Sequence, residues 1–306
     1  MITMLKRILT AVVALAVFLP ILLFAPYWMV AAVFGLLTAV AIFEIAGCVG
    51  LRREWWLTVA TMVLCVSYVV VPNVCNNWMV TTAYTGDIPM SAIRVASVLR
   101  TVVPEVCRGL LVLIYLIAAV LRHGKLPTDR VVLLFGMTVY VALGFDALCR
   151  LAGITAADAS NRIVPTNLWL WIALCIPWIA DTLAYFSGYF FGKKKLCPDI
   201  SPKKTVEGAV GGVVGTGVVA LVAFGCFSRW GFPLTLLGVS LAAMLLAIVS
   251  IFGDLFASVL KRQFGVKDYG FIFPGHGGVM DRFDSTIPVA IILSLLLNAA
   301  SLIGML

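Results

Sequence analysis

The stretch Ser258–Asp284 reads SVLKRQFGVKDYGFIFPGHGGVMDRFD and concentrates charged residues in a chain that is otherwise mostly apolar. Apolar runs flank it, at about 233–260 and 285–304. Runs of roughly 17–25 apolar residues are long enough to cross a bilayer as helices. We therefore predict that this stretch is a polar connection between the last two membrane helices, and that the rest of the chain houses it.

The composition of the whole chain is that of a multi-span membrane protein. Of its 306 residues, 62% are hydrophobic and 12% are charged, whereas a soluble domain has about 25% charged residues. No polar region is long enough to form a separate soluble domain. The net charge of +8 comes from basic residues in short loops between apolar runs, as is usual beside a membrane. We expect one membrane domain in contact with the lipid bilayer, and no nucleic-acid binding.

The apolar windows predict an all-α, polytopic integral membrane protein with about nine transmembrane helices. If the N-terminus is cytoplasmic, every inner segment carries Lys or Arg, which agrees with the positive-inside rule. The nine windows are about 8–25, 28–47, 55–73, 106–121, 131–149, 167–191, 208–228, 233–260 and 285–304.

Within this domain we distinguish two parts. Residues 1–165 hold the first five windows and an outer loop at about 74–105, whose charges predict a solvated face. Residues 166–306 hold the last four windows and the motifs that suggest chemistry. Cys75 and Cys107 could form a disulfide on the outer side, although sequence alone does not determine cysteine pairing.

Asp254 is a carboxylate inside an apolar window. Such a residue is costly in a membrane and usually functional. Ser258 and Lys261 follow it at i+4 and i+7 on the same helical face, so a polar stripe runs from Asp254 into the charged stretch. A buried structural Asp–Lys pair is the alternative interpretation.

The segment Phe273–Asp284 combines glycines with two carboxylates. Gly277 and Gly278 permit a tight turn and a close approach to a ligand. Asp281 then opens the last window, and together with Asp254 it could bind one Mg²⁺, which is typically held by one or two carboxylates and substrate phosphates. The alternative is a glycine-rich turn with ordinary helix-capping acids.

His276 lies in the same segment. A lone histidine is more often structural than catalytic. We expect it to shape the site, with a direct proton-transfer role as the alternative.

A second group of polar residues precedes the window at 208–228. Asp181 is again a carboxylate inside a window, and the turn Ser201–Thr205 carries Lys203 and Lys204, which could bind phosphates as point charges. Glycines at 208, 211, 212 and 215 form small-xxx-small pairs that favour close helix packing. Two further acids, Glu44 and Asp146, also lie in apolar windows, and either could belong to a polar cavity.

The pattern Ser258-x-Leu-Lys-Arg, Lys267-Asp268 and Phe273-Pro-Gly-His-Gly-Gly-x-x-Asp281-Arg282-x-Asp284 resembles the signature of the phosphatidate cytidylyltransferases, also called CDP-diacylglycerol synthases. The resemblance covers residues 170–306, and the first half matches only as a set of hydrophobic spans. It implies a membrane enzyme of phospholipid biosynthesis that converts CTP and phosphatidate into CDP-diacylglycerol and pyrophosphate. It also implies a Mg²⁺ requirement, a homodimer, and Asp254 and Asp281 as metal ligands.

On this interpretation the site faces the cytoplasm at the cell membrane, and catalysis depends on positioning and on neutralising phosphate charge. The expected catalytic residues are Asp254, Asp281, Lys261, Arg282 and His276. The expected substrate- or phosphate-binding residues are Lys203, Lys204, Ser201, Ser258, Arg262, Lys267, Asp181, Gly277, Gly278 and Asp284.

Three alternatives stay open at this point. A related cytidylyltransferase could act on another lipid phosphate, such as an ether lipid, because the motif does not specify the tails. A transporter could use the intramembrane acids for ion coupling, but the chain lacks the matched halves typical of many transporters. A lipid-binding or scaffolding protein would not need an Asp-rich site.

Overall fold

The chain folds as two compact units. The computed structural model describes residues 16, 18–83, 89–157, 163–165, 167–227, 236–272 and 277–302. The first unit consists of Met1–Leu168 and Val266–Arg282, and the second of Trp169–Gly265 and Phe283–Leu306. The described residues of the polar stretch between 266 and 282 therefore fold with the N-terminal helices.

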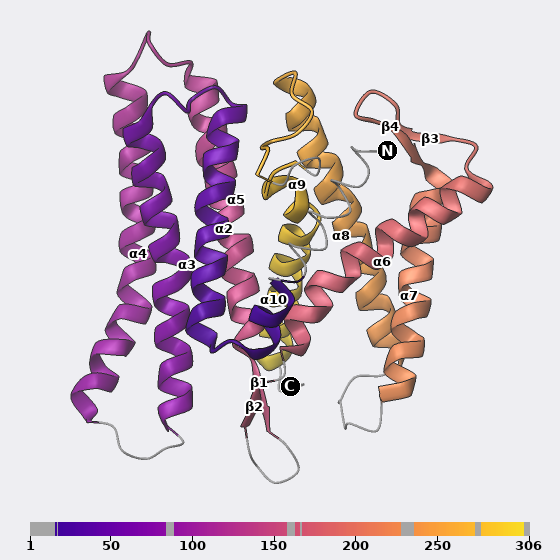
Figure 1. The fold of residues 1–306 in the computed structure, drawn as a ribbon, viewed down its shortest axis with the longest axis horizontal. Coiled ribbons are helices and arrows are strands. Elements are labelled where there is room, and N and C mark those ends of the chain that lie inside the picture. Colours follow the sequence, from indigo (N-terminus) through magenta and orange to yellow (C-terminus); the bar gives the residue numbers. More distant parts are fainter. Residues whose placement is uncertain are drawn as a thin grey trace. The chain divides into compact units, whose positions relative to one another are not determined.

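The first unit is built on a bundle of four long helices (Figure 1). Helix α3 packs against the other three, and α2 also contacts α5. Phe34 of α2 and Phe145 of α5 are fully buried, with ring centroids 6.2 Å apart, and they form part of the core. The elements of this bundle are α2 (Tyr27–Cys48), α3 (Trp55–Ala83), α4 (Met90–Leu121), α5 (Thr128–Ala152) and the antiparallel pair β1 (Thr155–Ala157) and β2 (Ile163–Pro165).

The second unit contains the remaining long helices and a short hairpin that joins α6 to α7 (Figure 1). Helix α8 contacts both α7 and α10. Its elements are α6 (Leu168–Phe191), β3 (Lys195–Cys197), β4 (Ser201–Thr205), α7 (Val206–Phe227), α8 (Leu236–Gln263) and α10 (Thr286–Leu302). The short helix α9 (Met280–Phe283) contains the last residues of the first unit.

The helices confirm the prediction of an all-α, polytopic membrane protein. Among the described residues, seven helices are long and apolar enough to cross a membrane, and α10 is a shorter apolar helix of 17 residues. Half of the expected window at about 8–25 lies outside the described residues. The number of nine spans and the cytoplasmic N-terminus therefore stay predictions.

The expected outer loop at about 74–105 is mostly helical. Helix α3 continues to Ala83 and α4 begins at Met90, so the connection shrinks to residues 84–89. The threonines near the end of α3 satisfy their hydroxyl groups inside the helix. The Thr81 hydroxyl, for example, donates to the Asn77 carbonyl one turn earlier, at 3.0 Å.

Asp146 lies in a structural network within the first unit. Its Oδ1 accepts a hydrogen bond of 2.7 Å from the Asn73 side-chain amide, and its Oδ2 lies 2.7 Å from Nη2 of Arg150. A buried carboxylate needs such partners to offset the loss of water. This network links α3 to α5, and we assign Asp146 a role in packing.

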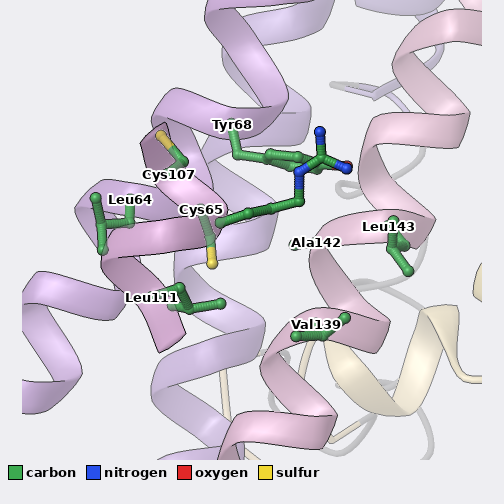
Figure 2. A pocket seen from close by; sticks show the side chains of 9 residues that line it. Leu64, Cys65, Tyr68, Cys107, Leu111, Val139, Ala142 and Leu143 are labelled. Atoms are coloured by element: carbon green, nitrogen blue, oxygen red, sulfur yellow. The ribbon is translucent and has the colours of Figure 1, made fainter. Parts of the chain in front are cut away.

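A pocket opens between α3, α4 and α5 (Figure 2). It is mainly apolar and contains none of the residues expected in the catalytic site. Cys107 lines it, and both Cys107 and Cys75 are free thiols, so the disulfide considered from the sequence is not formed. The lining residues are Leu64, Cys65, Tyr68, Cys107, Arg108, Leu111, Val139, Ala142 and Leu143.

A glycine face of α7 packs directly against α6, as the small-xxx-small pairs predict. A Cβ atom added at Gly212 would lie 2.8 Å from the Ala180 carbonyl oxygen. One added at Gly215 would lie 2.7 Å from Cδ1 of Leu183. A side chain at Gly212 would collide with the backbone of α6, whereas at Gly215 the nearest atom is the end of the Leu183 side chain. Close approach of this kind is how small residues drive helix association in a bilayer.

We predict that Gly212→Val destabilises the protein by about 1–3 kcal/mol, the usual cost of overpacking. The measurement is thermal unfolding of the purified protein in detergent. Gly225→Val is the matched control in the same helix, because a Cβ at Gly225 meets nothing within 4 Å. Equal melting temperatures for the two variants would contradict the tight α6–α7 contact.

Candidate functional site

The β3–β4 hairpin gives its two lysines different surroundings. Successive side chains of a strand point to opposite faces, and the expected turn at Ser201–Thr205 is in fact the strand β4. Lys204 forms an ion pair with Oδ2 of Asp254 on α8, whereas Lys203 is exposed. The sequence grouped these lysines together, but only Lys204 pairs with Asp254, which is half-buried.

The hairpin is fastened to the start of α7. The Glu207 carboxylate accepts hydrogen bonds from the backbone N–H groups of Lys193, at 3.1 Å, and Lys194, at 3.2 Å. The Thr205 hydroxyl accepts a hydrogen bond of 3.1 Å from the Gly208 N–H, which is a helix N-cap. These bonds hold β4, and with it Lys204, against the helices. Glu207 was not among the expected site residues, although an acid in the first turn of a helix is a recognisable capping signal.

Asp254 is the centre of a charged cluster in the second unit. Asp181 of α6 interacts electrostatically with Lys204 and with Asp254. Asp284 does the same with Asp254 and with Lys261. Three carboxylates and two lysines, drawn from α6, β4, α8 and the start of α10, therefore act on one another within this unit. We call them the Asp254 cluster.

Asp284 is buried at the start of α10, with 8% of its surface exposed. Burial raises the pKa of its carboxyl to about 7, the Asp254 carboxylate adds to the rise, and Lys261 opposes it. Helix α10 comes close to α8 at Gly253, where a Cβ would lie 2.6 Å from the Asp284 carbonyl oxygen. Perturbed carboxyl groups of this kind are common in functional sites.

In the first unit, backbone N–H groups of the glycine-rich segment bind the Asp281 carboxylate. Its Oδ2 accepts hydrogen bonds from the backbone N–H groups of Tyr269, at 2.8 Å, and Gly278, at 2.9 Å. Gly277 has φ of +83°, a left-handed conformation that favours glycine. The backbone of the motif therefore fixes the direction of the Asp281 carboxylate.

Glu44 of α2 contacts the same segment. Its Oε1 accepts a hydrogen bond of 3.0 Å from the Val279 N–H, and its Oε2 accepts one of 2.9 Å from the Met280 N–H. Only 4% of the Glu44 surface is exposed. In the sequence Glu44 is an isolated acid, because the residues in contact are 235 positions or more apart.

The structure distributes the other expected site residues as follows. Ser201 and Ser258 are partly exposed, on β4 and α8 respectively. The remaining cations are at the surface, and His276 lies outside the described residues. The exposed cations are Lys203, Arg262, Lys267 and Arg282.

The side chains present suit a hard cation such as Mg²⁺, which prefers oxygen ligands. Among the described residues, no group of three or more His, Cys, Asp or Glu is placed to hold a metal ion. A site made of two carboxylates and substrate phosphates does not require such a group. Ser250 lies one turn before Asp254 on α8. Its hydroxyl is fully buried and has no hydrogen-bond partner in the described part of the chain, so it offers one more oxygen ligand near the Asp254 carboxylate.

Comparison with known proteins agrees with this chemistry. The model of the cytidylyltransferase family matches residues 5–300. The chain belongs to this family. The resemblance inferred from the motifs is confirmed, and it extends into the N-terminal half of this cytidylyltransferase.

Several curated relatives carry the name phosphatidate cytidylyltransferase. The protein of Staphylococcus epidermidis is 32% identical over 293 residues, which cover 95% of this chain and 98% of the relative. The protein of Bacillus subtilis is 35% identical over 57% of this chain and 61% of its own length. The protein of Staphylococcus saprophyticus is 41% identical over 52% of this chain. In this last alignment the chain spans about half of the relative, 55% of its length.

We predict that Lys204→Met lowers the thermal stability more than Lys203→Met. The first change leaves the carboxylate of Asp254 without its cation, beside the other acids of the cluster, and we expect a loss of about 1–2 kcal/mol. The second removes an exposed charge, and exposed substitutions usually have little effect. Thermal unfolding in detergent compares the two, and a larger loss for Lys203→Met would show that the ion pair is wrongly assigned.

Proposed function

We propose that this cytidylyltransferase transfers a cytidylyl group from CTP to phosphatidate, giving CDP-diacylglycerol and pyrophosphate for phospholipid biosynthesis. The names of the relatives support the proposal, above all that of the relative aligned over 98% of its length. The observation that carries it is the Asp254 cluster, since paired carboxylates and lysines among apolar helices are suited to phosphate chemistry.

The reaction joins two phosphates. An oxygen of the phosphatidate phosphate attacks the α-phosphorus of CTP, and the bond from this phosphorus to the β-phosphate oxygen breaks as pyrophosphate leaves. The attacking oxygen is already anionic, so the protein needs to position it more than to deprotonate it. The main barrier is the accumulation of negative charge, which fixed cations reduce.

In this proposal Asp254 and Asp281 hold Mg²⁺ together with the CTP phosphates. The ion, when bound, neutralises negative charge on the departing pyrophosphate. Lys204 stands beside Asp254 and binds phosphate oxygens as a point charge. The other basic residues of the motif, Lys261, Arg262, Lys267 and Arg282, bind the triphosphate and the lipid phosphate.

The membrane arrangement is also part of the proposal. The N-terminus is cytoplasmic, nine helices span the cell membrane, and the site opens to the cytoplasm, where CTP is found. The distribution of Lys and Arg among the connecting segments supports this orientation. Phosphatidate enters sideways between helices, so that its tails stay in the bilayer, and the enzyme works as a homodimer.

We predict that the purified protein releases pyrophosphate and forms CDP-diacylglycerol from CTP and phosphatidate, and that Mg²⁺ is required. The assay uses detergent micelles with a Mg²⁺ titration. Diacylglycerol, which lacks the attacking phosphate, is the negative control, and an ether-lipid phosphate tests the choice of acceptor. Folded protein that releases no pyrophosphate with phosphatidate would refute the proposal, and strong preference for the ether lipid would reassign the substrate.

We predict that Asp254→Asn and Asp281→Asn each lower the turnover number by about 10²–10³-fold, the range seen when one charge-stabilising group is lost. Asp129→Asn is the control, because Asp129 is exposed in the first turn of α5. The two-carboxylate metal site would be wrong if both site variants kept near-normal turnover at the usual Mg²⁺ concentration.

A further inference from the structure

Glu44 occupies a socket made of backbone from the motif. Both of its carboxylate oxygens accept N–H groups, from Val279 and Met280. A Cβ added at Gly270 would lie 2.8 Å from Cγ of Glu44 and still closer to its carboxylate, and a Cβ at Gly278 would also collide with that carboxylate. The two glycines therefore leave space for this one side chain.

The socket and the Asp281 turn share the same backbone. Asp281 accepts the N–H groups of Tyr269 and Gly278, which are adjacent in sequence to Gly270 and Val279 of the socket. The two N–H groups that Glu44 accepts belong to the two residues directly before Asp281. A displacement of Glu44 would therefore move the backbone that carries the Asp281 carboxylate.

We propose that Glu44 is a positioning residue for Asp281, and that α2 thereby controls the affinity of the active site for its divalent cation. This inference rests on the proposed role of Asp281 as a metal ligand. Buried partners that orient a metal ligand commonly change metal affinity or activity by about 10–100-fold when they are replaced. A misplacement of about 1 Å is enough to slow a reaction about 100-fold.

The contrast with Asp146 distinguishes positioning from general packing. Both acids are buried in the first unit, but Asp146 binds the side chains of Asn73 and Arg150, which are not part of the motif. Asp146→Asn is therefore a matched control. It removes a buried charge from the same unit and leaves the Asp281 turn intact.

The test variant is Glu44→Gln, which keeps the size of the side chain. One of its two terminal groups is an NH₂ donor, so it opposes one of the two backbone N–H groups and can accept only the other. Hydrogen–deuterium exchange of the metal-free protein measures the protection of residues 277–282. Mn²⁺ binding without substrates, and the Mg²⁺ concentration that gives half the maximal rate, report on the metal site.

We expect Glu44→Gln to exchange faster at residues 277–282, to bind Mn²⁺ about 10–100-fold more weakly, and to need correspondingly more Mg²⁺ for turnover. Asp146→Asn should match the wild type in all three. If exchange rises while Mn²⁺ binding and Mg²⁺ dependence do not change, Glu44 is only structural and the proposal is wrong. Unchanged exchange would overturn it as well.

Gly270→Ala provides a second variant if Glu44→Gln fails to fold. Its methyl group displaces the Glu44 carboxylate without removing it, and the same three results are expected. The wild-type protein separates this inference from the proposed function. A wild type that does not convert CTP and phosphatidate refutes that function, whereas exchange and Mn²⁺ binding still decide whether Glu44 positions Asp281.

Discussion

A carboxylate placed among apolar helices must be compensated, and this constraint organises both units of the molecule. Three acids gain this compensation from different partners. Asp254 takes a lysine from the β3–β4 hairpin, Asp146 takes an amide and a guanidinium, and Glu44 takes two backbone N–H groups. Because charge is costly in a membrane, these partners determine which helices and loops are held together.

The kind of partner that each carboxylate has corresponds to the role of that acid. Side-chain partners tie one helix to another, as Asn73 does for Asp146. A cation such as Lys204 can exchange a carboxylate for a phosphate, so the Lys204–Asp254 pair suits a site that binds anions. Backbone partners fix a loop. Through Glu44, helix α2 therefore holds the backbone directly before Asp281.

Much of the fold and of the candidate site could be read from the sequence. Apolar length predicted the helices because the thickness of a bilayer imposes it, and the glycine spacing in α7 predicted its close approach to α6. The extent of α3 could not be read, because Thr81 satisfies its hydroxyl group inside the helix. The hairpin was also missed, since β3 and β4 are short and polar and carry no hydrophobic alternation.

The sequence by itself determined the membrane class and the family, since these depend on composition and on local spacing. Only the tertiary structure decided that Lys204 and not Lys203 meets Asp254, and that Glu44 holds the turn before Asp281. The physical reason is that both contacts join residues far apart in the chain. Strand direction and helix packing select such partners, and no local pattern records that choice.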